Sequence, residues 1–211
     1  MRKYIAMALA VLSLAVIMPR DLSAITFGLK GGVNFSNVSV VTSGEVPDFK
    51  NLQGLTGGVF LNLNLGPVGI QPEVLYSRRG MKFNETVEGG TLTVKYMLDY
   101  IEVPLLLKLT VVPVGPVRPI VYAGPAFSYL LKAKEEAVLP GVGEESNEVT
   151  DQFKRESWDG VVGGGLEFRL PVIKLLSLEV RYHFGLSNIN KGLEADTVKN
   201  KGFSLMVGIG F

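Results

Sequence analysis

Ionisable side chains recur at alternate positions of several apolar segments, and their types could support acid–base chemistry. Glu73 and Glu179, for example, each stand within a segment in which polar and apolar residues alternate. Pairs of carboxylates on one face can act as general acid and general base. Basic residues of the same alternation nearly balance these acids, which favours a structural network of ion pairs instead. The predicted network consists of Lys30, Glu73, Glu102, Lys108, Glu167, Arg169, Glu179 and Arg181.

His183 is the only histidine of the chain, and the chain has no cysteine. It lies on the polar side of the alternation near the end of its segment, with Ser187 close by, so a hydrolytic role is one hypothesis. The other hypothesis is a histidine within the polar network. Zinc and similar metals prefer several nitrogen or sulfur ligands, which one histidine does not supply. We therefore predict no catalytic residue, no metal site and no cofactor.

The segments that must position these side chains have the two-residue period of β-strands. In the segment Tyr100–Leu109, Ile101, Val103 and Leu105 alternate with polar residues that include Glu102. Eight such segments follow one another. They are Phe27–Ser36, Leu55–Leu65, Val68–Ser77, Thr93–Thr110, Arg118–Leu131, Gln152–Leu170, Leu176–Phe184 and Phe203–Phe211.

The connections between these strands are alternately long and short, as in an up-and-down barrel inserted through a membrane from one side. The sequence therefore predicts an all-β fold: an eight-stranded antiparallel up-and-down transmembrane β-barrel with long extracellular loops and short periplasmic turns. Its apolar face would meet lipid and its charged face would fill the lumen. A soluble barrel of the lipocalin type is the alternative. The predicted long loops are Asn37–Asn51, Arg78–Leu92, Lys132–Asp151 and Ser187–Lys201.

The first residues have the pattern of an export signal. Arg2 and Lys3 precede the apolar run Ile5–Met18, and small residues end at Ala24. The run is shorter than the roughly 20 residues that a membrane-spanning helix needs. We predict a signal peptide over residues 1–24 and a barrel domain over residues 25–211. The formal net charge of +1 gives no electrostatic reason to expect nucleic-acid binding.

Four motifs together resemble the PorT-like family of outer-membrane β-barrels. They are Gly28–Ser36, Gln71–Ser77, Tyr100–Lys108 and Ala123–Pro125. The resemblance implies a barrel in lipid of the cell outer membrane with both termini in the periplasm. The last strand, which ends at Phe211, resembles the signal that such barrels present to the outer-membrane insertion machinery. One branch of the family is associated with secretion of proteins across the outer membrane.

The expected function is that of a non-enzymatic integral outer-membrane protein. Its charged, plugged lumen would serve the structure, and its extracellular loops would meet a partner. The acids of Lys132–Asp151 could bind a basic partner or a divalent cation, or be solvated. A narrow channel for small solutes and a component of protein secretion are the alternatives, followed by an outer-membrane enzyme and a soluble lipocalin-like binder.

Overall fold

The computed structural model describes residues 25–41, 49–87, 90–111, 116–139, 143–170, 173–191 and 197–211. The predicted signal peptide, residues 1–24, lies outside these ranges and stays a prediction. Within them, no helix has the length and apolarity needed to span a bilayer. The strands are β1 (Ile25–Val41), β2 (Lys50–Leu65), β3 (Val68–Val87), β4 (Gly90–Thr110), β5 (Val117–Leu139), β6 (Gly143–Glu148), β7 (Glu156–Phe168), β8 (Leu175–Gly185) and β9 (Thr197–Gly210).

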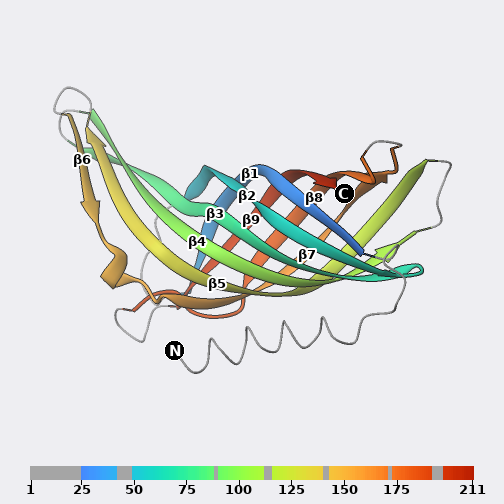
Figure 1. Ribbon diagram of the computed structural model, residues 1–211. Helices are drawn as coiled ribbons and strands as arrows, with labels where there is room; N and C mark the ends of the chain where they lie inside the picture. The colour runs from blue at the N-terminus through green and yellow to red at the C-terminus, as the bar shows by residue number, and fades with distance from the viewer. Residues whose placement is uncertain are drawn as a thin grey trace.

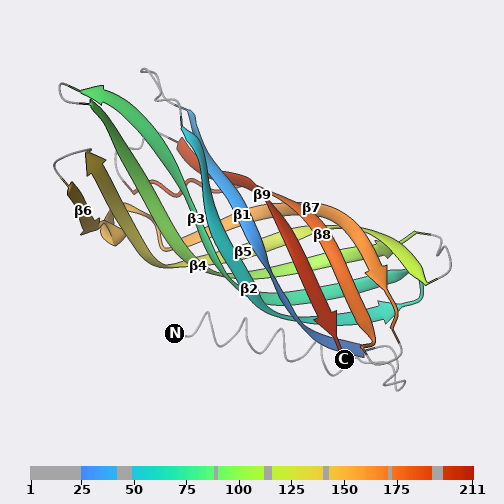
Figure 2. The ribbon, with the colours of Figure 1, turned by 90° about the horizontal axis from the view of Figure 1, so that it is seen from above.

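Eight of these strands pair with their neighbours into a closed antiparallel ring. The first and last strands, β1 and β9, pair antiparallel and lie side by side in Figure 2. The pairing of β4 with β5 completes the ring. The predicted eight-stranded up-and-down barrel is thus confirmed. β6 is an additional strand outside the ring, and it pairs with β5 alone among the described strands.

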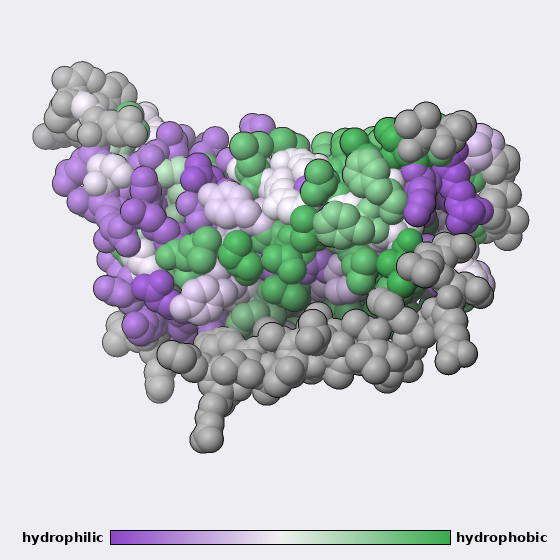
Figure 3. All heavy atoms as spheres, in the orientation of Figure 1, coloured by the Kyte–Doolittle hydropathy of each residue, from purple (hydrophilic) through white to green (hydrophobic). Residues whose placement is uncertain are grey.

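The two faces of the barrel wall have the polarity predicted for a membrane protein. Glu73 is 2% exposed and its neighbour Val74 is 47% exposed, while Lys108 is 1% exposed and Leu107 is 55% exposed. The exterior therefore presents apolar side chains, which form a hydrophobic band across the face seen in Figure 3. Charged side chains point into the lumen, because a charge on the lipid face is destabilising. The backbone groups of a closed ring bond one another, so the outer side needs no water.

Two of the predicted long loops are mainly strands. Within Arg78–Leu92, β3 continues to Val87 and β4 begins at Gly90, and Lys132–Asp151 contains the end of β5 and all of β6. These hairpins project at the upper left of Figure 1. Their polarity is reversed relative to the membrane part, because Met81 and Leu98 are buried on the inner face while Lys82 lies on the outer one. Polar residues there indicate strands in water.

The other two predicted loops are also shorter than predicted, because strands extend into them. In the segment Asn37–Asn51, β1 continues to its end at position 41 and β2 begins at position 50. In the segment Ser187–Lys201, β9 begins at position 197. The strand predicted to start at Gln152 starts at Glu156, because the 3-10 helix η3 (Thr150–Gln152) precedes it.

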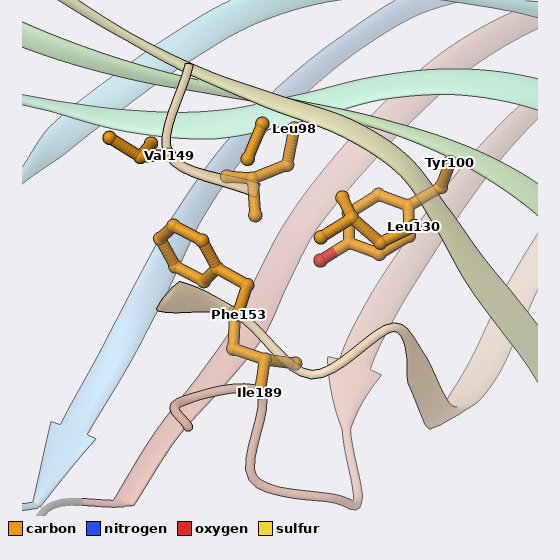
Figure 4. Close-up of a cluster of buried hydrophobic side chains, with 7 residues drawn as sticks. Leu98, Tyr100, Leu130, Val149, Phe153 and Ile189 are labelled. Atoms are coloured by element: carbon orange, nitrogen blue, oxygen red, sulfur yellow. The ribbon is translucent and has the colours of Figure 1, made fainter. Parts of the chain in front are cut away.

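A buried apolar cluster, here called the outer cap, covers the extracellular end of the lumen (Figure 4). It consists of Leu98, Tyr100, Leu130, Ala133, Val149, Phe153 and Ile189. Val198 of β9 packs against it. The amide of Asn200 on β9 donates a hydrogen bond of 3.4 Å to the hydroxyl of Tyr100 on β4. These two strands lie on opposite sides of the ring, so the outer cap spans the lumen.

Candidate functional site

Four charged side chains from three strands meet in the middle of the lumen and form the central cluster. They are Lys30 of β1, Glu73 of β3, and Glu179 and Arg181 of β8. The ammonium of Lys30 lies 2.9 Å from Glu73 and 2.8 Å from Glu179. The guanidinium of Arg181 donates two hydrogen bonds to Glu73, of 2.7 and 2.9 Å. Two cations and two carboxylates therefore balance each other, with short bonds suited to a buried site.

The central cluster continues towards the periplasmic end through polar side chains. The amide of Gln71 donates to Glu73 at 2.7 Å and accepts a hydrogen bond of 3.3 Å from Lys108. Lys108 also forms an ion pair of 2.7 Å with Glu167. Because Gln71 both donates and accepts, one chain of hydrogen bonds links the two groups of ions.

Aromatic rings fill the space beside the central cluster. The guanidinium of Arg181 lies 5.2 Å from the ring centroid of Tyr122, and the ammonium of Lys30 lies 5.1 Å from that of Phe60. These distances suit cation–π contacts. A Cβ atom at Gly163 would come within 2.6 Å of the Tyr122 ring, so the glycine allows this ring to lie against the wall.

A second group of ions, the outer cluster, lies nearer the outer cap and contains Arg79, Glu102 and Asp159. The guanidinium of Arg79 bonds Glu102 at 2.7 Å and Asp159 at 2.8 Å. The other carboxylate oxygen of each acid is buried without a hydrogen-bond partner in the described structure, and so is the hydroxyl of Ser157. Two carboxylates share one cation, so this cluster carries an excess negative charge.

His183 takes part in a hydrogen-bond chain that starts at Arg79. The guanidinium lies 3.1 Å from Nδ1 of His183, and Nε2 lies 3.3 Å from the hydroxyl of Ser204. Arginine can only donate, so Nδ1 accepts and the proton of a neutral imidazole is on Nε2. Ser204 in turn donates to Asn34, whose amide donates to Ser77 at 2.7 Å. His183 therefore donates towards Ser204 and cannot take its proton.

Among the eight predicted network residues, the structure brings most together. Lys30, Glu73, Glu179 and Arg181 form the central cluster, and the pair of Lys108 and Glu167 joins it through Gln71. Glu102 belongs to the outer cluster. Arg169 is the exception, because it follows the end of β7, is exposed, and has no ion pair with a described residue.

The prediction missed Arg79 and Asp159 as members of the network. Arg79 lay within the segment predicted as a loop, although it continues the alternation of Glu73 and Ser77. Asp159 has the same alternation as Glu167 on its own strand. Extending the two-residue period in both strands would have found them.

The described residues include no group of three or more His, Cys, Asp or Glu side chains placed to hold a metal ion. The carboxylates of the lumen instead accept hydrogen bonds from its lysine and arginine side chains. The chemistry of this arrangement is that of buried ion pairs, in which loss of one partner leaves an uncompensated charge.

A closed ring of strands with an apolar exterior and an ionic interior defines an integral membrane β-barrel. The chain belongs to the family described as outer membrane protein beta-barrel domain, whose profile matches residues 19–191. The protein is accordingly located in the outer membrane, with the membrane lipid around its apolar face. A search of curated proteins gives no match.

Solved outer-membrane structures show similarity over most of the chain at low sequence identity. Neisserial surface protein A is 14% identical, with 88% of this chain and 97% of that chain covered and a TM-score of 0.48. The outer membrane protease OmpT from Escherichia coli is 10% identical, with 89% and 96% covered and a TM-score of 0.44. Ail, the attachment invasion locus protein of Yersinia pestis, is 17% identical, with 89% and 99% covered and a TM-score of 0.43.

Proposed function

We propose that this protein is a non-conducting, non-enzymatic outer-membrane protein that acts through its extracellular strands. The observation that supports this best is the filling of the lumen. Ion pairs and aromatic rings occupy its middle, and the outer cap covers its extracellular end. The cavity beside His183 and Ser204 has a volume of about 10 Å³, enough for about one water molecule.

The extracellular ends of β3 to β6 form the surface that would meet a partner. They begin where an ion pair of 2.7 Å between Arg78 and Asp99 lies on the outer face of the wall. Among the described strands β6 pairs with β5 only, so its second edge offers backbone donors and acceptors to an added strand. Glu145 and Glu148 make this strand acidic, which favours a basic extended segment as the partner.

The hydrogen bonds of His183 support a role without catalysis. A serine nucleophile requires a neighbouring base that accepts its proton. Here the imidazole accepts from Arg79 and donates towards Ser204, which is opposite to that requirement. Ser204 is also 1% exposed, so a substrate would have no access to it.

Conductance measurements test the filled lumen. The purified protein in planar lipid bilayers is expected to give no current steps above the background of protein-free bilayers. Discrete steps that depend on added protein would instead support the narrow small-solute channel.

Labelling of single cysteines tests the extracellular surface, since the chain has no cysteine of its own. Lys134→Cys, on the exposed face of β5, is expected to react with a membrane-impermeant maleimide in intact cells. Leu107→Cys, on the lipid face, is the matched control and is expected to stay unlabelled. Labelling of Lys134→Cys only after the outer membrane is opened would contradict the proposal.

We also propose that the chain is a member of the PorT-like outer-membrane β-barrel family and carries a signal peptide over residues 1–24. The motif Gly28–Ser36 lies in β1, and Gln71–Ser77 in β3 places Glu73 in the central cluster. β9, which Phe211 directly follows, would be the strand read by the insertion machinery. The amide of Phe211 donates to the carbonyl of Phe27 at 2.8 Å, and its ring is 55% exposed on the lipid face.

A further inference from the structure

The periplasmic end of the lumen opens into a cavity of about 300 Å³, here called the periplasmic mouth. Residues from strands all round the ring line it, including Thr26 of β1, Asn64 of β2 and Thr110 of β4. Arg118 of β5 and Arg169, just after β7, contribute two guanidinium groups. Lys174, just before β8, contributes an ammonium group. The site is therefore concave, polar and basic.

In the part of the chain that the structure describes, the three cations of the periplasmic mouth have no ion-pair partner. None of Arg118, Arg169 and Lys174 forms an ion pair with any residue that the structure describes. Glu167 is the one acid in the lining, and Lys108 already neutralises it at 2.7 Å. Each cation of the two buried clusters, by contrast, contacts at least one carboxylate.

Acidic side chains are scarce at this end of the barrel, since positions 66–67, 111–116 and 169–174 of the sequence contain no Asp or Glu. The terminal carboxylate of Phe211 also lies at this end, beside Leu175, and it forms no ion pair among the described residues. The acids of the connecting segments lie at the opposite end, for example six of them between positions 132 and 151, Glu135, Glu136, Glu144, Glu145, Glu148 and Asp151. An unbalanced positive charge in a concave site attracts and concentrates anions.

Isolated cations at a barrel rim are ordinarily solvated, but two features distinguish these. Arg118 is only partly exposed and lies directly across the ladder from Glu167, so its side chain belongs to the lumen wall. The cations also share one cavity with hydroxyl and amide donors, namely those of Thr26, Asn64 and Thr110. Planar guanidinium groups bind two oxygens of a carboxylate or phosphate at once.

We propose that the periplasmic mouth binds an oxyanion group, a phosphate or a carboxylate, presented from the periplasm. The cavity volume exceeds that of the group alone, so it admits the atoms to which the group is attached. A phospholipid headgroup of the inner leaflet and a soluble periplasmic anion both have this chemistry. The site is separate from the extracellular strands and does not depend on their role.

The test uses the full chain, purified from outer membranes in a detergent with a sugar headgroup. Inorganic phosphate is titrated at constant ionic strength against chloride, and unfolding is followed by the fluorescence of Trp158, the one tryptophan. Phosphate is expected to raise the unfolding midpoint of the wild-type protein. Arg118→Gln combined with Arg169→Gln is expected to raise the phosphate concentration that gives half of this shift about tenfold or more.

Two further variants keep the result interpretable. Arg169→Gln alone changes an exposed residue that has no ion pair with a described residue, so the barrel is expected to fold and to lose part of the response. Lys134→Gln combined with Lys154→Gln and Lys191→Gln removes three exposed cations at the extracellular end and is expected to keep the full response. An equal response in all four proteins would overturn the proposal, as would none in the wild type.

Nanodiscs separate the two sources of the anion. The phosphate titration is repeated in phosphatidylcholine and in phosphatidylglycerol. If phosphatidylglycerol removes the response that phosphatidylcholine preserves, the occupant is a lipid headgroup. If the response is the same in both, the occupant is a soluble oxyanion. Both lipids carry a phosphate, so loss of the response in both, when the detergent-solubilised protein keeps it, also indicates a lipid headgroup.

Discussion

The central cluster and the outer cluster are both buried in the lumen, yet their atoms are bonded to different degrees. Both oxygens of Glu73 accept hydrogen bonds, from Lys30, Gln71 and Arg181. Glu102 is as buried as Glu73, but only one of its oxygens has a partner among the residues that the structure describes. The two carboxylates are therefore equally buried, but Glu73 accepts more hydrogen bonds than Glu102.

This difference indicates which ions hold the barrel together. Removal of one partner from a balanced buried group leaves an uncompensated charge, which is strongly destabilising. Removal of a carboxylate from a group with excess negative charge leaves the remaining pair intact. The central cluster is thus expected to be rigidly required, and the outer cluster to tolerate change in its acids.

The largest effect is expected for Glu73→Gln. The substitution keeps the shape of the side chain but leaves Arg181 with Glu179 alone, at 3.6 Å. The free energy of unfolding is expected to fall by about 3–5 kcal/mol. Urea unfolding in lipid vesicles measures it, and a loss below about 1 kcal/mol would contradict the role of the central cluster.

A smaller loss is expected for His183→Ala. It removes the acceptor for Arg79 and the donor to Ser204, and leaves buried polar groups with fewer partners. The expected loss is about 1–3 kcal/mol. The same unfolding measurement decides it, with Ser204→Ala as the comparison that removes the bonds of Ser204 to His183 and Asn34 and keeps the one between Arg79 and His183. Unchanged stability would show that the chain is not formed.

Glu102→Gln is the matched counterpart of Glu73→Gln, with the same chemistry at a site of the same burial. Asp159 remains bonded to Arg79 after the change, at 2.8 Å. Stability is expected to stay within about 1 kcal/mol of the wild type. A loss as large as that of Glu73→Gln would show that the two clusters are equally required.

The smallest effect is expected at an exposed ion pair, which shows what burial adds. Hydrogen bonds from Lys132 and Thr150 hold the pKa of Glu148 below its usual value. Its contribution is therefore present above the pKa of the unfolded chain and is lost as the pH falls through the lower folded value. Hydrogen exchange of β6 is expected to rise slightly in Glu148→Gln at pH 7 and to match the wild type in acid. If the two proteins exchange equally at both pH values, the contact of Glu148 does not stabilise β6.

The alternation of residues was sufficient to predict the barrel and most of its ionic interior. Lys108 and Glu179 could be placed because each strand assigns every second residue to one side. Arg169 could not, since the rule holds only within a strand and β7 ends one residue earlier. The alternation also could not predict which charges pair with each other, because the partners lie on other strands and depend on the register around the ring.

The extracellular hairpins were missed because their composition resembles that of loops. Between Arg78 and Leu92 polar residues are frequent, but the period of two continues with apolar residues such as Met81 and Phe83 on the inner side. A strand in water places its polar residues outside, whereas the same strand in lipid places them inside. Period and polarity must therefore be evaluated separately along a strand that crosses the boundary.

The ion pair between Lys30 and Glu179 has a consequence for biogenesis. Lys30 is on the first strand and Glu179 on the penultimate one, so the pair joins them across the seam between β1 and β9. The pair can form only after nearly the whole polypeptide has arrived and the wall has been sealed. An unfinished or truncated chain leaves Lys30 with Glu73 as its one carboxylate among these two and with a gap in the wall beside it, and the missing second ion pair distinguishes incomplete assemblies from the finished protein.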